Sequence, residues 1–243
     1  DAMSVASAIL SKDPANKRSL LAKATIYVDI KEYNKSLKEY NKAIKLYPND
    51  IALIIERGDL YRFGLKDGEK AEKDFNTAIE LDSNYWQTYM YRAWLYENLK
   101  QYDKALADYT KAIELDKNYP AKRYCDRAGC YEEMENYTNA LMDYTRAIDF
   151  APDNPLYYNS RADFYEEQLK YDEALADYAT VIELSTSVAA ITMALNNRAI
   201  IYSRQEEYNL AIEEHTTVKL TKKLNVYFHL NLLSLVENPK LFL

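Results

Sequence analysis

The stretch RAWLYENLKQYDKALADYTKAIELD (residues 92–116) decides the fold, because two later stretches align on it without a gap. They are RAGCYEEMENYTNALMDYTRAIDFA (127–151) and RADFYEEQLKYDEALADYATVIELS (161–185), and the three begin 35 and 34 residues apart. Self-similarity at this period is typical of a solenoid in which each unit is a pair of helices stacked on the next pair. The sequence therefore predicts one elongated all-α protein rather than several globular domains.

The repeat extends over six units, which cover residues 17–50, 51–85, 86–120, 121–154, 155–188 and 192–225. The first predicted helix of each unit has a small residue and, three positions later, a tyrosine: Ala24 with Tyr27, Gly58 with Tyr61, Ala93 with Tyr96, Ala128 with Tyr131, Ala162 with Tyr165, and Ala199 with Tyr202. The second helix has a small residue and, four positions later in five units, an aromatic one: Ser36 with Tyr40, Ala71 with Phe75, Ala105 with Tyr109, Ala140 with Tyr144, and Ala174 with Tyr178. Small residues let helix backbones approach, and a ring one turn away fills the space that they leave.

This pattern resembles the tetratricopeptide repeat (TPR) family over residues 17–225, and Pro48 and Pro152 match the closing proline of that family. The resemblance implies a right-handed superhelical solenoid of antiparallel helix pairs, whose first helices line a concave groove. The chain departs from the family pattern at a one-residue insertion around Arg62–Lys70. It also departs in the sixth unit, where His215 replaces the aromatic residue.

Two charged columns accompany the packing columns. The first helices carry Arg57, Arg92, Arg127, Arg161 and Arg198, and the second helices carry Asp74, Asp108, Asp143, Asp177 and Glu214. Each arginine adjoins a small packing residue, so we expect its stem to lie between helices and its head to form an ion pair; a ligand-binding ladder is the alternative. Repeated columns also hold 18 of the 24 tyrosines, which we interpret as scaffold.

The two ends of the chain differ from the repeats. Residues 1–16 have Ala2, Ala6 and Ile9 at helical spacing, which indicates a second helix without its first: a partial repeat or a vector-derived remnant. Residues 226–243 are predicted to form a C-terminal capping helix and tail. Because this segment is apolar nearly all round, it either folds back on the sixth unit or offers a self-association surface.

The composition disfavours several classes of function. The net charge of −7 argues against nucleic acid, and no uncharged run approaches the ~20 apolar residues that span a bilayer. Cys125 and Cys130 lack CxxC spacing, and the chain has only two histidines, so we expect no metal and no cofactor. A Gly-rich phosphate loop and a GxSxG motif are both absent from the sequence, so we expect no enzyme.

In the resembled family the first helices face the ligand, so the candidate partner-binding residues are those outside the packing columns. They are Gln87, Met90, Tyr91, Trp94, Glu97, Lys122, Cys125, Asp126, Glu132, Asn159, Asp163 and Glu166. This surface is apolar around Met90 and Trp94 and acidic beyond them. We therefore expect a protein or peptide partner with Lys or Arg and one apolar anchor, and we predict that Trp94 is a hot spot.

These observations favour a non-enzymatic scaffold that binds a protein segment in the groove. Two alternatives stay open: a self-associating structural module, which would form a homo-oligomer through the apolar ends, and the repeat region of a larger protein whose catalytic domain is absent. A cytoplasmic location is favoured, with a removed signal peptide as the alternative because the chain begins at Asp1 rather than at Met.

Overall fold

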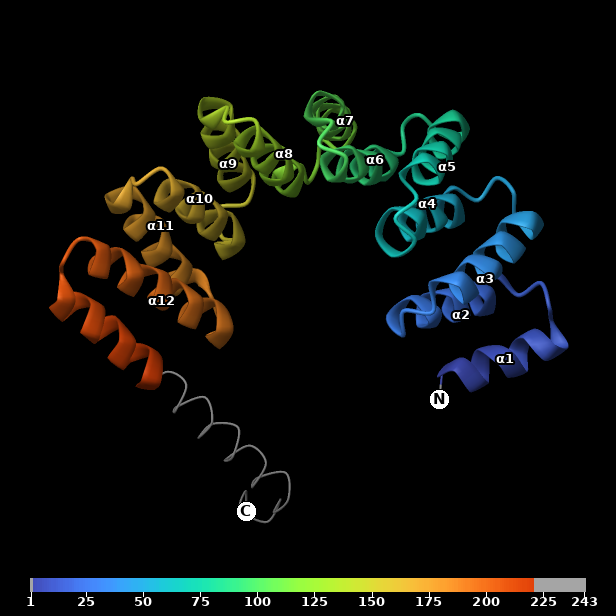
Figure 1. Ribbon diagram of the computed structural model, residues 1–243, viewed down its shortest axis with the longest axis horizontal. Helices are drawn as coiled ribbons and strands as arrows, with labels where there is room; N and C mark the ends of the chain where they lie inside the picture. The colour runs from blue at the N-terminus through green and yellow to red at the C-terminus, as the bar shows by residue number, and fades with distance from the viewer. Residues whose placement is uncertain (1, 221–243) are drawn as a thin grey trace, which may run out of the picture. The chain divides into compact units, whose positions relative to one another are not determined.

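The computed structural model describes residues 2–220, and every regular element in that range is a helix (Figure 1). This confirms the predicted all-α class. The chain divides into two compact units: unit 1 ends at Asn136 and unit 2 begins at Tyr137. The predicted capping helix and tail at 226–243 lie outside the described residues.

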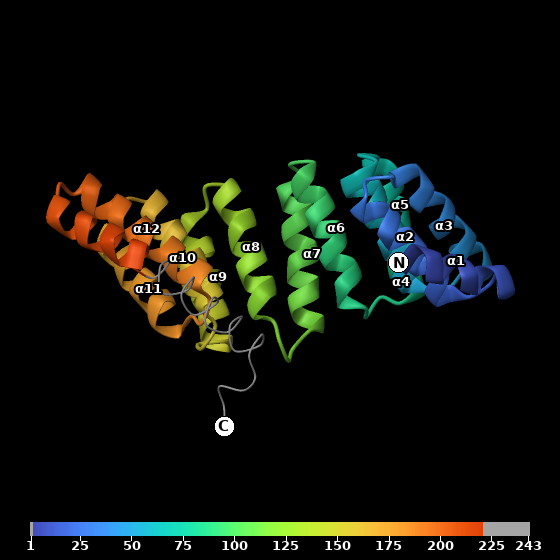
Figure 2. The same cartoon turned by 90° about the horizontal axis from the view of Figure 1, so that it is seen from below.

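Within each unit, helices that follow one another along the chain pack side by side (Figures 1 and 2). We call the first helix of each repeat an A helix and the second a B helix. Unit 1 contains α1 (Ala2–Lys12), α2 (Lys17–Asp29), α3 (Tyr33–Leu46), α4 (Ile51–Asp59), α5 (Gly68–Leu81), α6 (Trp86–Asn98), α7 (Tyr102–Leu115) and α8 (Ala121–Glu133). Unit 2 contains α9 (Tyr137–Phe150), α10 (Pro155–Glu167), α11 (Tyr171–Leu184) and α12 (Val188–Arg204), followed by helical residues 208–220. The division into a partial repeat, six repeats and a cap stays a prediction.

The A helices end in one common way, although the sequence has no glycine at these ends. A residue just past the C-cap has left-handed backbone, as at Lys100 (φ 55°) after α6 and Leu169 (φ 57°) after α10. The next N–H then donates to the carbonyl oxygen of the repeated tyrosine, as from Gln101 to Tyr96 at 2.8 Å. This Schellman-type closure satisfies a carbonyl that the helix leaves open. It brings the chain into the B helix after a turn of fixed length.

The insertion predicted around Arg62–Lys70 takes the form of η1 (Leu60–Gly64), a π-helical turn directly after α4. The Asp67 N–H donates to the Tyr61 carbonyl oxygen at 2.8 Å, six residues back, whereas the closures described above span five. The wide turn therefore absorbs the extra residue, and α5 still begins in the common position. Turns of this kind are frequent at functional positions.

The packing columns form the core of each unit. Ala93 and Tyr109 in unit 1 and Ala162 and Tyr178 in unit 2 have no exposed surface. Burial of a large apolar side chain contributes about 1.5–3 kcal/mol, so these columns stabilise the helix pairs. The tyrosines that open the B helices are less buried, and Tyr208 is 61% exposed. The scaffold interpretation therefore holds for the inner columns and is wrong for Tyr208.

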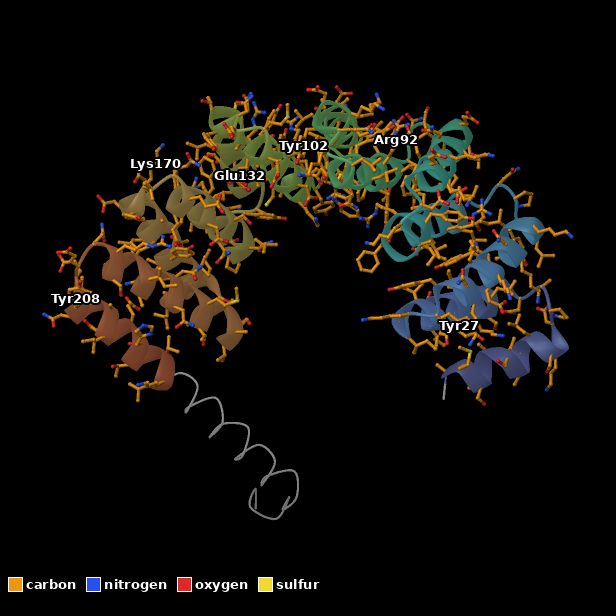
Figure 3. All side chains as sticks on the ribbon, in the orientation of Figure 1. Tyr27, Arg92, Tyr102, Glu132, Lys170 and Tyr208 are labelled. Atoms are coloured by element: carbon orange, nitrogen blue, oxygen red, sulfur yellow. The ribbon has the colours of Figure 1, made fainter. Side chains whose placement is uncertain are left out.

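The charged columns form ion pairs between A and B helices. Arg92, labelled in Figure 3, donates from Nε and Nη2 to the two carboxylate oxygens of Asp108, each at 2.7 Å. Its Nη1 donates to Asn76 Oδ1 at 2.6 Å. Further pairs join Arg57 to Asp74, Arg161 to Asp177, and Arg198 to Glu214. The ion-pair interpretation is confirmed for these four arginines, whose heads are engaged inside the scaffold.

Candidate functional site

The A helices α6 and α8 line an apolar pocket of about 200 Å³ in unit 1. Its walls are Trp86, Gln87, Met90, Tyr91 and Trp94 from α6, and Lys122 and Arg123 from α8. Met90 is only 3% exposed, whereas the side chain of Lys122 is 55% exposed. The pocket therefore reaches from the solvent to the core of the unit.

Two buried side-chain atoms of the pocket lining, Gln87 Oε1 and Arg123 Nε, form no hydrogen bond with the described residues, and Gln87 Oε1 is the acceptor. The Oε1 atom of Gln87 is buried and accepts no hydrogen bond from the residues that the structure describes. A buried acceptor left without a donor costs about 1–3 kcal/mol. A ligand N–H placed in the pocket would offset this cost, so Gln87 gives the pocket a means of orienting a bound chain.

Trp94 lies between two cations at the mouth of the pocket. The Arg62 guanidinium is 5.9 Å and the Lys122 ammonium 5.5 Å from the centre of its ring. Tyr91 meets the same ring edge-on, with centroids 5.1 Å apart. Arg62 is contributed by the π-helical turn, so the one-residue insertion places a charge beside the tryptophan. These contacts fix the ring in place without covering the pocket.

Both cations are neutralised by carboxylates of their own helix. Arg62 Nε donates to Asp59 Oδ1 at 2.8 Å, and Lys122 Nζ donates to Asp126 Oδ1 at 2.8 Å. The cations around Trp94 are thus part of closed pairs. They therefore do not make the pocket a strong anion site.

The other wall of the pocket is held by Arg123. Its guanidinium lies 3.6 Å from the centre of the Trp86 ring and forms an ion pair with Asp116 at 2.7 Å. It also donates from Nη1 to the Tyr119 carbonyl oxygen at 2.9 Å. These contacts tie the loop between α7 and α8 to the pocket wall and restrict the freedom of the Trp86 ring.

Glu97 is a carboxylate beside the pocket that forms no ion pair with a described residue. It accepts a hydrogen bond from the Tyr109 hydroxyl at 2.6 Å, and no described Lys or Arg forms an ion pair with it. Burial raises the pKa of Glu97, as do the negative charges of Asp126 and Glu133, whereas the Tyr109 hydroxyl and the Arg62 charge oppose this shift. Burial also raises the pKa of Asp126, although Lys122 opposes that shift. The ionised form of Glu97 is therefore stabilised only in part within the chain, and a ligand cation could stabilise it further.

The three candidates in unit 2 form a separate cluster on α10. Asp163 accepts hydrogen bonds from Asn159 Nδ2 at 2.8 Å and from the Tyr178 hydroxyl at 2.5 Å. Glu166 forms an ion pair with Arg204 at 2.8 Å. Partial loss of water, followed by the charges of Glu166 and Glu167, raises the pKa of Asp163. Asp163 thus resembles Glu97: both accept from a B-helix tyrosine and form no ion pair with a described residue.

The structure brings together part of the predicted site. Five predicted residues line the pocket: Gln87, Met90, Tyr91, Trp94 and Lys122. Glu97 and Asp126 lie on the same two helices, whereas Cys125 and Glu132, the latter labelled in Figure 3, are half-buried on α8 and do not line the pocket.

Sequence reasoning missed Trp86 and Arg123. A signal for Trp86 was present, because Trp86 and Trp94 are the only two tryptophans and lie eight residues apart, about two turns along one helix face. Nothing in the sequence singles out Arg123 from the other arginines. Its stacking on Trp86 depends on how α8 packs against α6.

Among residues 2–220, no group of three or more His, Cys, Asp or Glu side chains is arranged to hold a metal ion. In the same range, no helix is both long enough and apolar enough to cross a bilayer. The pocket thus offers apolar surface and one open acceptor, and a carboxylate without an ion-pair partner among the described residues lies beside it. These are groups that bind and orient a ligand.

Four stretches of the chain match sequence models described as tetratricopeptide repeat. One model matches residues 17–50, 52–85 and 121–154, and a second matches residues 86–119. Together the matches include more than half of the 243 residues. No curated protein matches the chain.

Solved structures show the same fold. A tetratricopeptide repeat protein from Parabacteroides merdae is 24% identical, with a TM-score of 0.66 over 90% of this chain and 85% of that chain. PilF of Pseudomonas aeruginosa is 13% identical, with a TM-score of 0.66 over 86% of this chain and 92% of that chain. MamA is 20% identical, with a TM-score of 0.55 over 66% of this chain and 93% of that chain. At these identities the likeness concerns the fold alone.

Proposed function

Because the chain belongs to the tetratricopeptide repeat family, whose members are generally non-catalytic protein-interaction modules, we propose that it is a scaffold that binds a segment of a partner protein at the pocket between α6 and α8. One observation carries the proposal. An apolar pocket of about 200 Å³ lies beside Glu97, a carboxylate without an ion-pair partner among the described residues.

The pocket supports an apolar anchor on the partner. Its walls are mostly aromatic and aliphatic, and its volume suits one side chain such as Leu, Met or Phe. Burial of such a side chain contributes about 1.5–3 kcal/mol. Trp94 supplies a rigid wall, because Tyr91 and two cations already hold its ring. A fixed aromatic side chain loses little entropy on binding, which is typical of interface hot spots.

Glu97 supports a cation on the partner. It follows Trp94 by three positions on α6, so the Cβ atoms of the two residues are about 5–6 Å apart on one face. A Lys or Arg near the anchor residue would therefore reach Glu97 and pair with its ionised form. Gln87 Oε1 can accept a backbone N–H of the same segment. The proposed partner segment thus combines one apolar and one basic residue.

Intrinsic fluorescence tests the proposal, because both tryptophans of the chain line this pocket. The probe is a set of acetylated, amidated hexapeptides with one Leu, Met or Phe and one Lys in a Gly–Ser background. We expect saturable changes in emission for peptides in which the Lys is two to four positions from the apolar residue. Peptides with neither residue serve as controls. If no peptide changes the emission at millimolar concentration, the proposal is wrong.

A double-mutant cycle then tests the role of Glu97. We expect Glu97→Gln to weaken binding of the Lys peptide about fivefold to tenfold, in keeping with a charge-assisted hydrogen bond of about 1–1.5 kcal/mol. The same variant should leave binding of a norleucine peptide unchanged. The matched control is Glu173→Gln, a substitution of an exposed residue of α11, which should affect neither peptide. Equal losses for both peptides would show that Glu97 acts through the fold and not by pairing with the cation.

Self-association is a second candidate, supported by exposed apolar side chains near both ends of the described chain. Val5 and Ile9 on α1 are 58% and 41% exposed, and Ile212 and Leu220 are 64% and 55% exposed. Sedimentation velocity between 5 and 200 µM distinguishes the candidates. We expect a concentration-dependent increase in mass that Ile212→Lys abolishes if this surface self-associates. A constant monomer mass would rule it out.

A further inference from the structure

Unit 2 has an apolar pocket of its own, with a volume of about 290 Å³. Its lining comes from the start of α10, the end of α11 and the start of α12: Asn154, Pro155, Leu156, Asn159, Val181, Ser185, Ser187, Ala190 and Met193. Leu156 and Met193 are 56% and 58% exposed, so apolar surface lies open to solvent at this pocket. None of the lining residues carries a charge.

The polar side chains of this pocket already have partners. Asn154 accepts the Leu156 N–H at 3.0 Å, and Asn159 Nδ2 donates to Asp163 at 2.8 Å. Ser185 Oγ accepts the Ser187 N–H at 3.1 Å, and Ser187 Oγ accepts the Ala190 N–H at 3.4 Å. These groups are engaged in local bonds that cap helices and close turns. The pocket therefore offers a ligand mainly apolar surface.

The pocket occupies the same place in the repeat as the pocket of unit 1. When the repeats are aligned on the arginine column, with Arg92 opposite Arg161, Gln87 corresponds to Leu156 and Met90 corresponds to Asn159. When Arg127 and Arg198 are superposed in the same way, Lys122 corresponds to Met193 and Arg123 to Ala194. Each pocket thus opens between the starts of two successive A helices. In the second pocket the apolar Met193 thus takes the place of Lys122, and Ala194, the counterpart of Arg123, is buried and does not line the pocket.

A carboxylate adjoins each pocket as well. Tyr109 and Tyr178 are equivalent residues of their B helices. The Tyr109 hydroxyl donates to Glu97, and the Tyr178 hydroxyl donates to Asp163 and, at 3.2 Å, to Glu166. Asp163 forms no ion pair with any described residue, whereas Glu166 is paired with Arg204. A neutral apolar pocket beside an unpaired carboxylate is complementary to an uncharged aliphatic side chain followed by a cation.

We propose that α10, α11 and α12 form a second peptide-binding site, which takes an aliphatic side chain in the pocket and a Lys or Arg at Asp163. This rests on the proposed function, since the partner class is the same, but the site is built entirely within unit 2. Asn159 and Asp163 are one turn apart, which is about 6 Å along α10. An extended peptide covers this distance in about two residues, and its alternate side chains share one face. The motif that fits is aliphatic–x–Lys or aliphatic–x–Arg.

Methionine methyl NMR of the full chain separates the two sites. The chain has only five methionines; Met90 lines the first pocket, Met193 lines the second, and Met3, Met134 and Met142 serve as internal references. The probe is the acetylated, amidated peptide Gly-Ser-Leu-Ser-Lys-Ser. We expect the Met193 methyl signal to shift and saturate with this peptide, and to shift at least fivefold less at equal concentration when the Lys is replaced by Glu.

Pocket filling provides the matched variants. Ala190 lines the pocket, whereas the adjacent Ala189 is exposed on α12 and does not line it. We expect Ala190→Phe to abolish the Met193 response and leave the Met90 response intact, and Ala189→Phe to change neither. Asp163→Asn should weaken binding at Met193 about tenfold for the Lys peptide and leave a norleucine peptide unaffected. Helical circular dichroism confirms that each variant is folded.

The possible outcomes separate this inference from the proposed function. A Met90 response without a Met193 response overturns the second site and supports the first. A Met193 response alone supports the second site and contradicts the first. A Met193 response that persists in Ala190→Phe overturns the second site. A Met193 shift that depends on protein concentration in the absence of peptide also overturns it, because the pocket would then bind a second copy of the chain. Silence at both methionines contradicts both proposals.

Discussion

Gly58 and Gly129 form a matched pair that tests how tightly the repeat columns pack. Gly129 is in the interior of α8, and Gly58 is the penultimate residue of α4, which continues directly into the π-helical turn. Gly58 occupies the small-residue column, where the other five units have alanine. A consensus argument therefore predicts that Gly58→Ala stabilises the chain. The structure predicts the opposite, because a Cβ atom at Gly58 would lie 2.6 Å from Phe75 Cε1.

The magnitude follows from two terms. Replacing glycine by alanine inside a helix stabilises by about 1 kcal/mol through backbone entropy. At Gly129 nothing lies within 4 Å of the added Cβ, so Gly129→Ala should show this gain alone. At Gly58 the added atom meets the fully buried Phe75 ring, and overpacking of that kind costs about 1–3 kcal/mol. We therefore expect Gly58→Ala to be between neutral and about 2 kcal/mol destabilising.

The assay is urea denaturation of the two variants and the parent chain, followed by circular dichroism at 222 nm. The decisive quantity is the difference between the variants, expected to be about 1–3 kcal/mol, because the helix-propensity term cancels in it. Gly58→Ala combined with Phe75→Leu should recover part of the loss. If Gly58→Ala stabilises as much as Gly129→Ala, the packing argument for the columns is refuted.

Three further predictions concern charge, pH and the π-helical turn. Asp108→Ala leaves Arg92 without its ion-pair partner between two helices, so we expect it to destabilise the chain by about 1.5–3 kcal/mol in urea denaturation. Its control is Glu114→Ala, which removes the exposed pair with Lys111 and should change stability by less than about 0.5 kcal/mol. Because burial raises the pKa of Glu97, the ionised form destabilises the free protein and this cost disappears as the pH falls through the raised pKa. Affinity for the Lys peptide should therefore fall as the pH drops through the raised pKa of Glu97, which lies above the ordinary value of a glutamate, and Glu97→Gln should flatten that profile, as measured by fluorescence titration. Deleting the exposed Phe63 should convert the π-helical turn to α-helix and move Arg62 away from the Trp94 ring, which a change in tryptophan emission would report. If the emission is unchanged while the helical circular dichroism is intact, the role assigned to the insertion is wrong.

The sequence predicted the fold in detail because each repeat must bury its apolar columns against its neighbours. Stacked pairs of helices are the arrangement that accounts for the period of 34 and 35 residues, for the columns of small residues and for the columns of aromatic rings. The arginine and aspartate columns were predictable as ion pairs for the same reason, since their positions beside the small residues place them between helices. The left-handed turns after the A helices were not predictable, because Lys100 and Leu169 occupy positions that usually favour glycine.

The candidate site was predictable only in part. Residues on one helix, such as Met90 and Trp94, follow from helical periodicity. Arg62 and Arg123 reach the tryptophans from other segments of the chain, and their placement depends on tertiary packing. The sequence also did not show which carboxylates lack a cation, because several acidic residues of the A helices are paired and Glu97 is not.

The sequence by itself thus determined the all-α repeat architecture and the residues that form its core, and it predicted the surface that we propose binds a partner. Repetition encodes these features, since every unit solves the same packing problem. Only the tertiary structure decided where that surface is hollow and which of its carboxylates form no ion pair. Pockets and open charges arise where side chains of different helices fail to fill space or to pair, and this depends on three-dimensional packing.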